Sequence, residues 1–130
     1  MKTPKRSIAI AAGIVFIAGV SWLGLAENRK RNDCKKRSAA FSREIETIKR
    51  DAQEQLKIGA NKADVARFFA EHDMRYVISE FDGSGTLKTA GCAPFFCGSD
   101  SALIGVRVKL SAAGTVAAEP IVMNLYTDCL

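Results

Sequence analysis

Apolar residues form one long uninterrupted run near the start of the chain and periodic patterns after it. Residues 8–26 contain no charged side chain and a single hydroxyl, that of Ser21. These nineteen residues would span roughly 28 Å as a helix, close to the thickness of a bilayer's hydrocarbon core. A helix of a soluble core would carry polar residues at every third or fourth position. The run therefore predicts a segment made for a membrane.

Two amphipathic helices are predicted after this run. The first begins near Ser38, a suitable N-cap, and ends before Gly59, a residue typical of helix C-termini. Its apolar residues recur at spacings of three and four and form one stripe, namely Phe41, Ile45, Ile48, Ala52 and Leu56. The second, shorter helix begins after Asn61 as N-cap, with Asp64 near the positive end of its dipole. Its expected apolar face is Val65, Phe68, Phe69 and His72.

From Arg75 onward the period changes to two, which predicts strands. Residues 75–81 and 86–90 are expected to be strands joined by a turn at Asp82–Gly85, because glycine and aspartate tolerate positive φ. A half-buried strand follows, with Ile104, Val106, Val108 and Leu110 pointing inward. Residues 111–114 turn the chain into a last strand at 115–126, where Pro120 indicates an edge position or a bulge. The predicted fold class is α+β, with two helices packed on a three- to four-stranded antiparallel sheet.

Charge is distributed unevenly along the chain. The formal net charge is +5, but residues 1–37 carry +7 and residues 38–130 carry −2. We therefore expect a basic n-region at 1–7, a transmembrane helix or signal segment at 8–26, a basic tether at 27–37 and a small α+β domain at 38–130. Nucleic acid is not an expected partner, because its binding needs a basic face on the folded domain.

The basic cluster after the membrane segment has two interpretations. In the first, the cluster contacts lipid headgroups, and each positive charge contributes about 1 kcal/mol of binding free energy near an anionic surface. In the second, it is a solvated linker. Its members are Arg29, Lys30, Arg31, Lys35, Lys36 and Arg37.

The fate and the orientation of the membrane segment both remain open. The length of the run and Trp22 near its end favour a retained anchor, whereas Gly24 and Ala26 provide the small residues that a signal peptidase reads. Six Lys or Arg after the run against three before it favour a cytoplasmic domain. Four cysteines in the remaining chain favour export to an oxidising compartment, and we adopt export to the bacterial periplasm as the working hypothesis.

The four cysteines are predicted to form structural disulfides. Cys92 and Cys97 are close enough in sequence to close a small loop, which would leave Cys34 to pair with Cys129. Zinc binding is disfavoured because no second close pair accompanies the C-x4-C spacing, and a thiol oxidoreductase site would need C-x-x-C. Free thiols are the alternative for a cytoplasmic domain.

Candidate chemistry outside the cysteines is sparse. His72 near a helix end is flanked by Glu71 and Asp73, which favours charge compensation over general-base catalysis. Ser84 lacks the strand-to-helix setting of a nucleophile elbow, and glycine-rich phosphate loops are absent from the sequence. Phe95 and Phe96, between two cysteines, either fold back onto the sheet or form a contact loop for a partner.

Two stretches resemble small bacterial envelope domains of the SmpA/OmlA type, the outer-membrane assembly lipoproteins. Residues 58–69 are similar to the start of such domains, and Val106–Leu110, Ala112–Val116 and Tyr126–Thr127 are similar to their final hairpin. The resemblance covers residues 45–128 and implies an α-α-β-β-β interaction domain without enzymatic activity. The Gly-x-Pro that usually ends the second helix and the lipid-anchoring Cys are missing, so no functional residue is carried over.

These features predict a non-enzymatic, membrane-tethered envelope protein. The expected location is the inner membrane, with one span and a periplasmic domain, or the periplasm after signal cleavage. The expected partners are the membrane and another envelope protein, and no cofactor, metal ion or small-molecule substrate is expected. The alternatives are a cytoplasm-facing protein whose basic stretch binds anionic lipid and an enzyme built around His72 or the cysteine loop.

Overall fold

The structure, a computed structural model, describes the backbone of residues 5–129 and the side chains of Trp22 and residues 24–129. The chain divides into two compact units, Met1–Lys36 and Arg37–Leu130, and helix α1, Lys5–Gln55, contributes to both. Among the described residues, no helix combines the length and the apolar character that crossing a bilayer requires. The expected membrane segment at 8–26 falls largely outside the described side chains and stays a prediction.

In the first unit, α1 runs without interruption through the basic residues that follow Ala26. Residues 27–37 contain no Pro or Gly and are rich in Lys and Arg, which favour helices. Arg31 Nε lies 3.5 Å from Glu27 Oε1 at the i,i+4 spacing that supports an exposed helix. The expected helix start at Ser38 is therefore wrong. An exposed helix needs no apolar stripe, so the spacing of apolar residues did not predict that residues 27–37 are helical.

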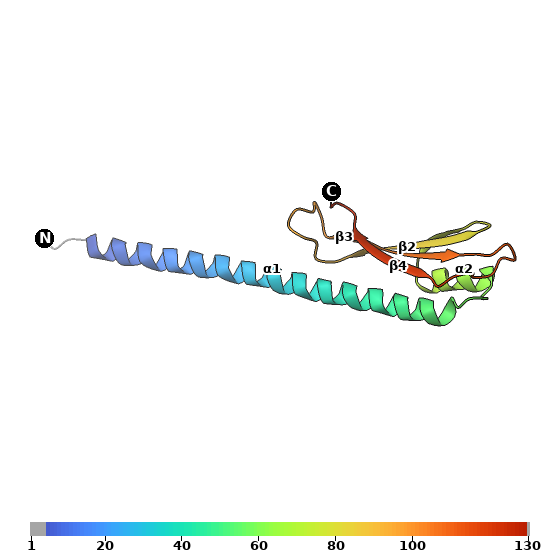
Figure 1. The fold of residues 1–130 in the computed structure, drawn as a ribbon. Helices are drawn as coiled ribbons and strands as arrows, with labels where there is room; N and C mark the ends of the chain where they lie inside the picture. Colours follow the sequence, from blue (N-terminus) through green and yellow to red (C-terminus); the bar gives the residue numbers. More distant parts are fainter. Residues whose placement is uncertain (1–4, 130) are drawn as a thin grey trace. The chain divides into compact units, whose positions relative to one another are not determined.

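In the second unit, two helices pack on one face of an antiparallel sheet, which confirms the α+β class (Figure 1). The helical layer consists of the Arg37–Gln55 part of α1 and of α2, Lys62–Glu71. The strands are β1 (Arg75–Ile78), β2 (Asp82–Ala90), β3 (Ser101–Lys109) and β4 (Ile121–Tyr126). Their spatial order is β1-β2-β3-β4, each strand antiparallel to the next. Strand β4 lies at an edge, as Pro120 indicated, and begins directly after this proline rather than containing it.

The connection between the helices follows the expected capping chemistry. Gly59 takes a positive φ of 96°, which costs glycine no strain. Asn61 Oδ1 accepts a hydrogen bond from the Asp64 N–H at 2.9 Å, and Asp64 Oδ2 accepts one from the Asn61 N–H at 3.2 Å. This capping box satisfies backbone donors at the start of α2 that would otherwise lack partners.

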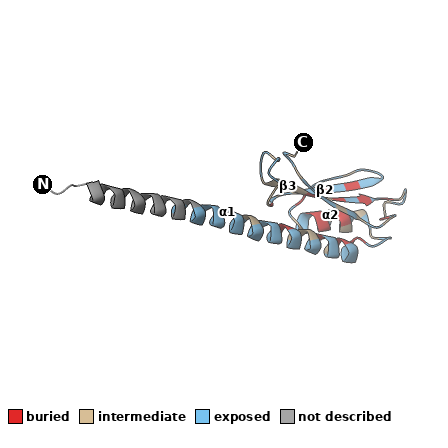
Figure 2. Cartoon of the chain, turned by 60° about the vertical axis from the view of Figure 1, so that its left-hand side comes forward, coloured by how far each residue is buried: buried red, intermediate tan, exposed pale blue. Residues whose placement is uncertain are grey.

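The predicted apolar stripes meet in one core between the helices and the sheet. Residues of β3 that point toward the helices alternate with residues that point away, so Ile104, Val106 and Val108 are buried. Figure 2 shows buried positions on α2 and on the strands beside it. The largest fully buried side chains are Ile48, Leu56, Val65, Phe68, Phe69, Ile104, Val106, Val108 and Val116. The opposite face of the sheet carries no helix of this unit.

The expected turn at Asp82–Gly85 is wrong. The chain reverses at Ser79–Asp82, where the Ser79 N–H donates to the Asp82 carbonyl oxygen at 2.7 Å, and Gly83 and Gly85 already lie in β2. A Cβ atom placed on Gly85 would lie 2.4 Å from Cδ1 of Phe69, and one on Gly83 would lie 3.3 Å from Cγ1 of Val65. These glycines therefore let α2 approach the strand closely.

The last strand is also shorter than expected. The turn at residues 111–114 is confirmed, with the Gly114 N–H donating to the Ser111 carbonyl oxygen at 2.9 Å and Gly114 at φ +74°. Thr115 and Val116 form isolated bridges with Asn61 and Leu110 rather than joining β4. This segment closes the end of the core, where Val116 is buried.

We predict that Gly85→Ala destabilises the domain by about 1–3 kcal/mol, the usual cost of overpacking a core. The added methyl group would overlap the Phe69 ring and force α2 away from β2. Chemical denaturation followed by circular dichroism measures the change. Gly98→Ala is the matched control, because its Cβ would meet its nearest neighbour at an ordinary 3.5 Å. Equal unfolding midpoints for the two variants would contradict the close approach.

Candidate functional site

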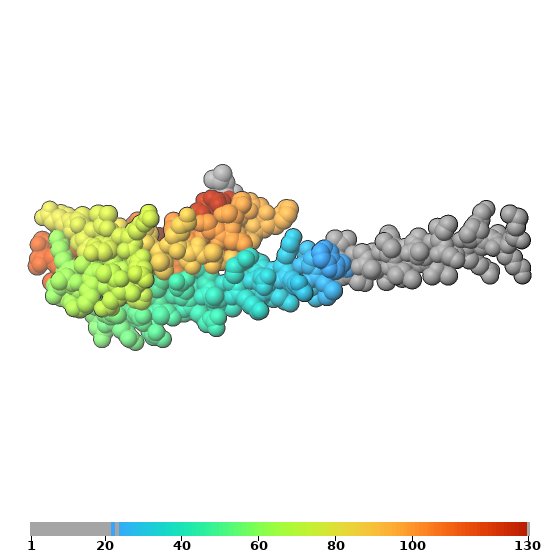
Figure 3. All heavy atoms as spheres, turned by 180° about the vertical axis from the view of Figure 1, so that it is seen from behind, coloured from blue at the N-terminus to red at the C-terminus, as the bar shows by residue number. Residues whose placement is uncertain are grey.

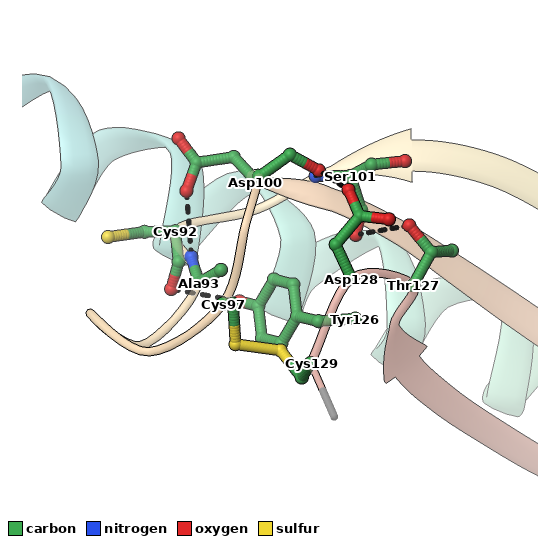
Figure 4. Close-up of a disulfide and its surroundings, with 10 residues drawn as sticks. Cys92, Ala93, Cys97, Asp100, Ser101, Tyr126, Thr127, Asp128 and Cys129 are labelled. Carbon is green, nitrogen blue, oxygen red and sulfur yellow. Dashed lines mark hydrogen bonds between the residues drawn. A yellow bond between two sulfur atoms is a disulfide. The ribbon is translucent and has the colours of Figure 1, made fainter.

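The loop between β2 and β3 is the most unusual surface feature of the second unit. Its base is closed by the Gly91 N–H, which donates to the Asp100 carbonyl oxygen at 2.9 Å. The Asp100 carboxylate accepts a second bond from the Ala93 N–H at 2.9 Å, and the Tyr126 hydroxyl donates to the Cys92 carbonyl oxygen at 3.1 Å (Figure 4). Several backbone groups of a ten-residue loop thus have fixed partners.

A disulfide joins this loop to the C-terminus. Cys97 pairs with Cys129, with their Cα atoms 4.3 Å apart. The expected pairs Cys92–Cys97 and Cys34–Cys129 are therefore wrong. The antiparallel register decides the pairing: the Thr127 N–H donates to the Ser101 carbonyl oxygen at 3.0 Å, and the Gly98 N–H donates to that of Asp128 at 3.1 Å. This continuation of the β3–β4 ladder brings residue 129 beside residue 97.

The other two cysteines, Cys34 and Cys92, are also disulfide-bonded, so the expectation of structural disulfides is confirmed for all four. Disulfides persist in oxidising compartments and are rare in the cytosol. The two disulfides accordingly indicate an extracytoplasmic domain.

Phe95 and Phe96 stand at the tip of the loop. Their exposed fractions are 104% and 75%, so the interpretation that they fold back onto the sheet is wrong. The Cys97 N–H donates to the Pro94 carbonyl oxygen at 2.9 Å, which closes a tight turn around both residues. In the space-filling view of Figure 3, the orange segment containing the loop lies at the surface beside the red C-terminal residues. The tip is thus an apolar surface on a restrained backbone.

The predicted headgroup-contact residues are placed in two different settings. The side chains of Arg29, Lys30, Arg31, Lys35 and Lys36 are exposed on α1 in the first unit. In the second unit, Nη2 of Arg37 donates to Oδ2 of Asp100 at 2.7 Å. Arg37 therefore supports the base of the loop through the same carboxylate that accepts from Ala93.

His72 caps the C-terminus of α2. Its Nε2 lies 3.5 Å from Oδ2 of Asp51, its ring centroid lies 4.6 Å from that of Phe68, and its side chain is 16% exposed. It lines a cleft of about 390 Å³ that also includes Arg43, Glu44 and Thr47. The carboxylate that faces the imidazole comes from α1 and not from its sequence neighbours Glu71 and Asp73. This arrangement is a structural pairing between two helices.

The remaining candidates have ordinary structural positions. Ser84 lies within β2 and pairs with Val77 and Arg107 across the sheet, which is not the setting of a nucleophile elbow. Among the described residues, no group of three or more His, Cys, Asp or Glu side chains is placed to hold a metal ion.

Comparisons with protein-family models, with curated proteins and with solved structures find no match to this chain. These comparisons therefore do not identify the chain as an SmpA/OmlA-type domain, and only the general fold that the resemblance implied is supported. The chain contains a small α+β domain with a four-stranded antiparallel sheet and two disulfides.

The sequence analysis did not predict two residues that support the loop. In the sequence, Asp100 looks like an ordinary loop carboxylate and Tyr126 like an ordinary strand residue. In the structure, each forms a hydrogen bond with the backbone of the loop. The one available signal was Gly91, whose Cβ would come within 2.6 Å of the Tyr126 hydroxyl oxygen. A lone glycine before a cysteine loop does not identify that partner.

We predict that Cys97→Ser leaves the thiol of Cys129 free while Cys92 stays bonded. Alkylation of the unreduced protein followed by peptide mass spectrometry identifies the free thiol. The double variant Cys97→Ser/Cys129→Ser should show no free thiol and should lose about 2–4 kcal/mol of stability, the typical contribution of a disulfide. A peptide containing Cys92 bonded to Cys97 in the unsubstituted protein would contradict the observed pairing.

Proposed function

We propose that this chain is a non-enzymatic, membrane-tethered protein of the bacterial cell envelope whose domain binds another envelope protein through the tip of the 91–100 loop. The observation that carries the proposal is the high exposure of Phe95 and Phe96 on a backbone restrained by a disulfide and by hydrogen bonds. Aromatic side chains on a rigid support are typical anchors of protein interfaces.

The energetics support contact with a partner. Burying a phenylalanine stabilises a complex by about 1.5–3 kcal/mol relative to leaving it in water. Because the Cys97–Cys129 disulfide and Asp100 already restrain the loop, binding costs less conformational entropy than it would for a mobile loop. A preformed aromatic tip is thus a favourable contact site that contributes little to the domain's own core.

The sequence and the disulfides together support a location in the cell envelope. The uncharged run at 8–26 has the length of a membrane segment, and the disulfides indicate an oxidising compartment. In a bacterium that compartment is the periplasm, and the proposal accordingly has the domain beyond the inner membrane and the run within it. The absence of enzymatic activity is part of the proposal, since His72 is engaged by Asp51 and by the Phe68 ring.

We predict that an alkaline-phosphatase fusion at the C-terminus is active, because this reporter folds only after export. A green fluorescent protein fusion at the same position is the matched control and should stay dark. The opposite pattern would place the domain in the cytoplasm and favour binding of anionic lipid by the Arg29–Arg37 stretch. Carbonate extraction of the same cells separates a retained anchor from a cleaved signal.

We predict that a photo-crosslinking amino acid at position 95 forms one discrete protein adduct in living cells, and that Phe96→Ala weakens this adduct. Position 81 is the matched control, because Phe81 is also an exposed phenylalanine, in the β1–β2 turn. Phe96→Ala should leave the free energy of unfolding within about 0.5 kcal/mol of the original value, as for other exposed positions. Identical adducts from positions 95 and 81, or adducts with lipid alone, would contradict the proposed contact.

A further inference from the structure

The edge strand β4 carries apolar side chains on both of its faces. An antiparallel sheet with one solvated face usually points apolar residues inward and polar residues outward. In β4, Val122 and Tyr126 pack against the core, but Ile121, Met123 and Leu125 point to the opposite face with exposed fractions of 53%, 40% and 50%. The strand thus presents three large apolar side chains on the face that carries no helix, hereafter the open face.

The rest of the open face carries four exposed cations beside the apolar Val77 and Leu103. The strand register places all four on the same side as Met123, namely Arg75, Lys88, Arg107 and Lys109. Among the described residues, none of these four cations forms an ion pair. The one acidic strand residue on this face is Asp82, which lies opposite Lys109. Residues 38–130 carry a net charge of −2, so this concentration of positive charge is local.

A shallow hollow lies where the two halves of the open face meet. It has a volume of about 70 Å³, and its lining includes Thr86, Gly105, Arg107 and Met123. The hollow exists because Gly105 has no side chain between Thr86 on one neighbouring strand and Met123 on the other. It can accept one side chain of a bound partner.

We propose that the open face binds an acidic amphipathic helix of a partner protein. The apolar flank of the helix packs on Ile121, Met123 and Leu125, and its carboxylates face Arg107 and Lys88. A helix is about 10 Å across and strands are about 4.8 Å apart, so one helix lying over β3 and β4 has its acidic flank above the basic strands. The contact repeats on the open face the packing of helix on sheet that builds the core.

The arrangement of charge favours a protein over a lipid surface. Side chains that enter a bilayer lie deeper than the cations that contact headgroups. On this domain the apolar and basic residues lie side by side on one sheet face, so a flat membrane would have to cover both at the same depth. An amphipathic helix has its apolar and acidic flanks side by side and therefore matches the open face.

The test uses the full chain in neutral detergent micelles and a fluorescent synthetic helical peptide with leucine on one flank and glutamate on the other. We expect saturable binding that Arg107→Glu/Lys88→Glu weakens by about tenfold or more. Arg43→Glu/Lys49→Glu is the charge-matched control, because both side chains are exposed on α1, away from the open face, and should leave binding unchanged. Met123→Ser, which removes apolar contact without adding charge, should also weaken binding.

A second peptide, with lysine in place of glutamate, completes the test. It should not bind the original protein and should bind the Arg107→Glu/Lys88→Glu variant. Equal binding of both peptides to the original protein would overturn the proposal, as would no saturable binding of the glutamate peptide. Binding to phosphatidylglycerol vesicles without binding to the glutamate peptide would overturn it in favour of a lipid partner. Crosslinking at position 95 tests the loop independently of all these outcomes.

Discussion

The fold of the domain depends on how closely α2 can approach the sheet. Phe69 and Val65 rest directly on a strand segment that has glycine where a side chain would stand, with Gly85 leaving room for the Phe69 ring. This contact fixes the height of the helical layer above β2 and β3. The inward residues of β3 then fill the space between the two layers and are almost completely buried.

The disulfides and the loop follow from the strand order. Because β4 returns antiparallel beside β3, the C-terminal residues meet the loop that precedes β3, and Cys129 reaches Cys97. A domain of about ninety residues buries a limited fraction of its surface, so a covalent connection at this end adds stability where the core does not extend. The same connection restrains Phe95 and Phe96 in solvent, which makes the loop suitable as a contact site.

Two surfaces of the domain carry the functional proposals, and they differ in chemistry. The loop tip offers two aromatic rings on a restrained backbone, whereas the open face of the sheet combines an apolar edge strand with four cations that form no ion pair with any residue the structure describes. Neither surface resembles a catalytic cleft. Both fit the proposed role of a domain that works through contacts in the envelope, and they involve different residues.

The sequence by itself determined the elements in which the spacing of apolar residues shows which side is buried. The stripe from Phe41 to Leu56, the face of α2, the Asn61 cap and the inward residues of β3 were all predicted, because periodicity records which side of an element meets a core. Exposed segments and contacts between distant parts of the chain produce no periodic apolar pattern in the sequence. The helical course of residues 27–37 follows from local helix propensity without an apolar stripe. The strand position of Gly83 and Gly85, the Cys97–Cys129 pairing and the outward Phe95 and Phe96 were decided by the tertiary structure. Each of them depends on which distant segment lies alongside, or on the absence of one.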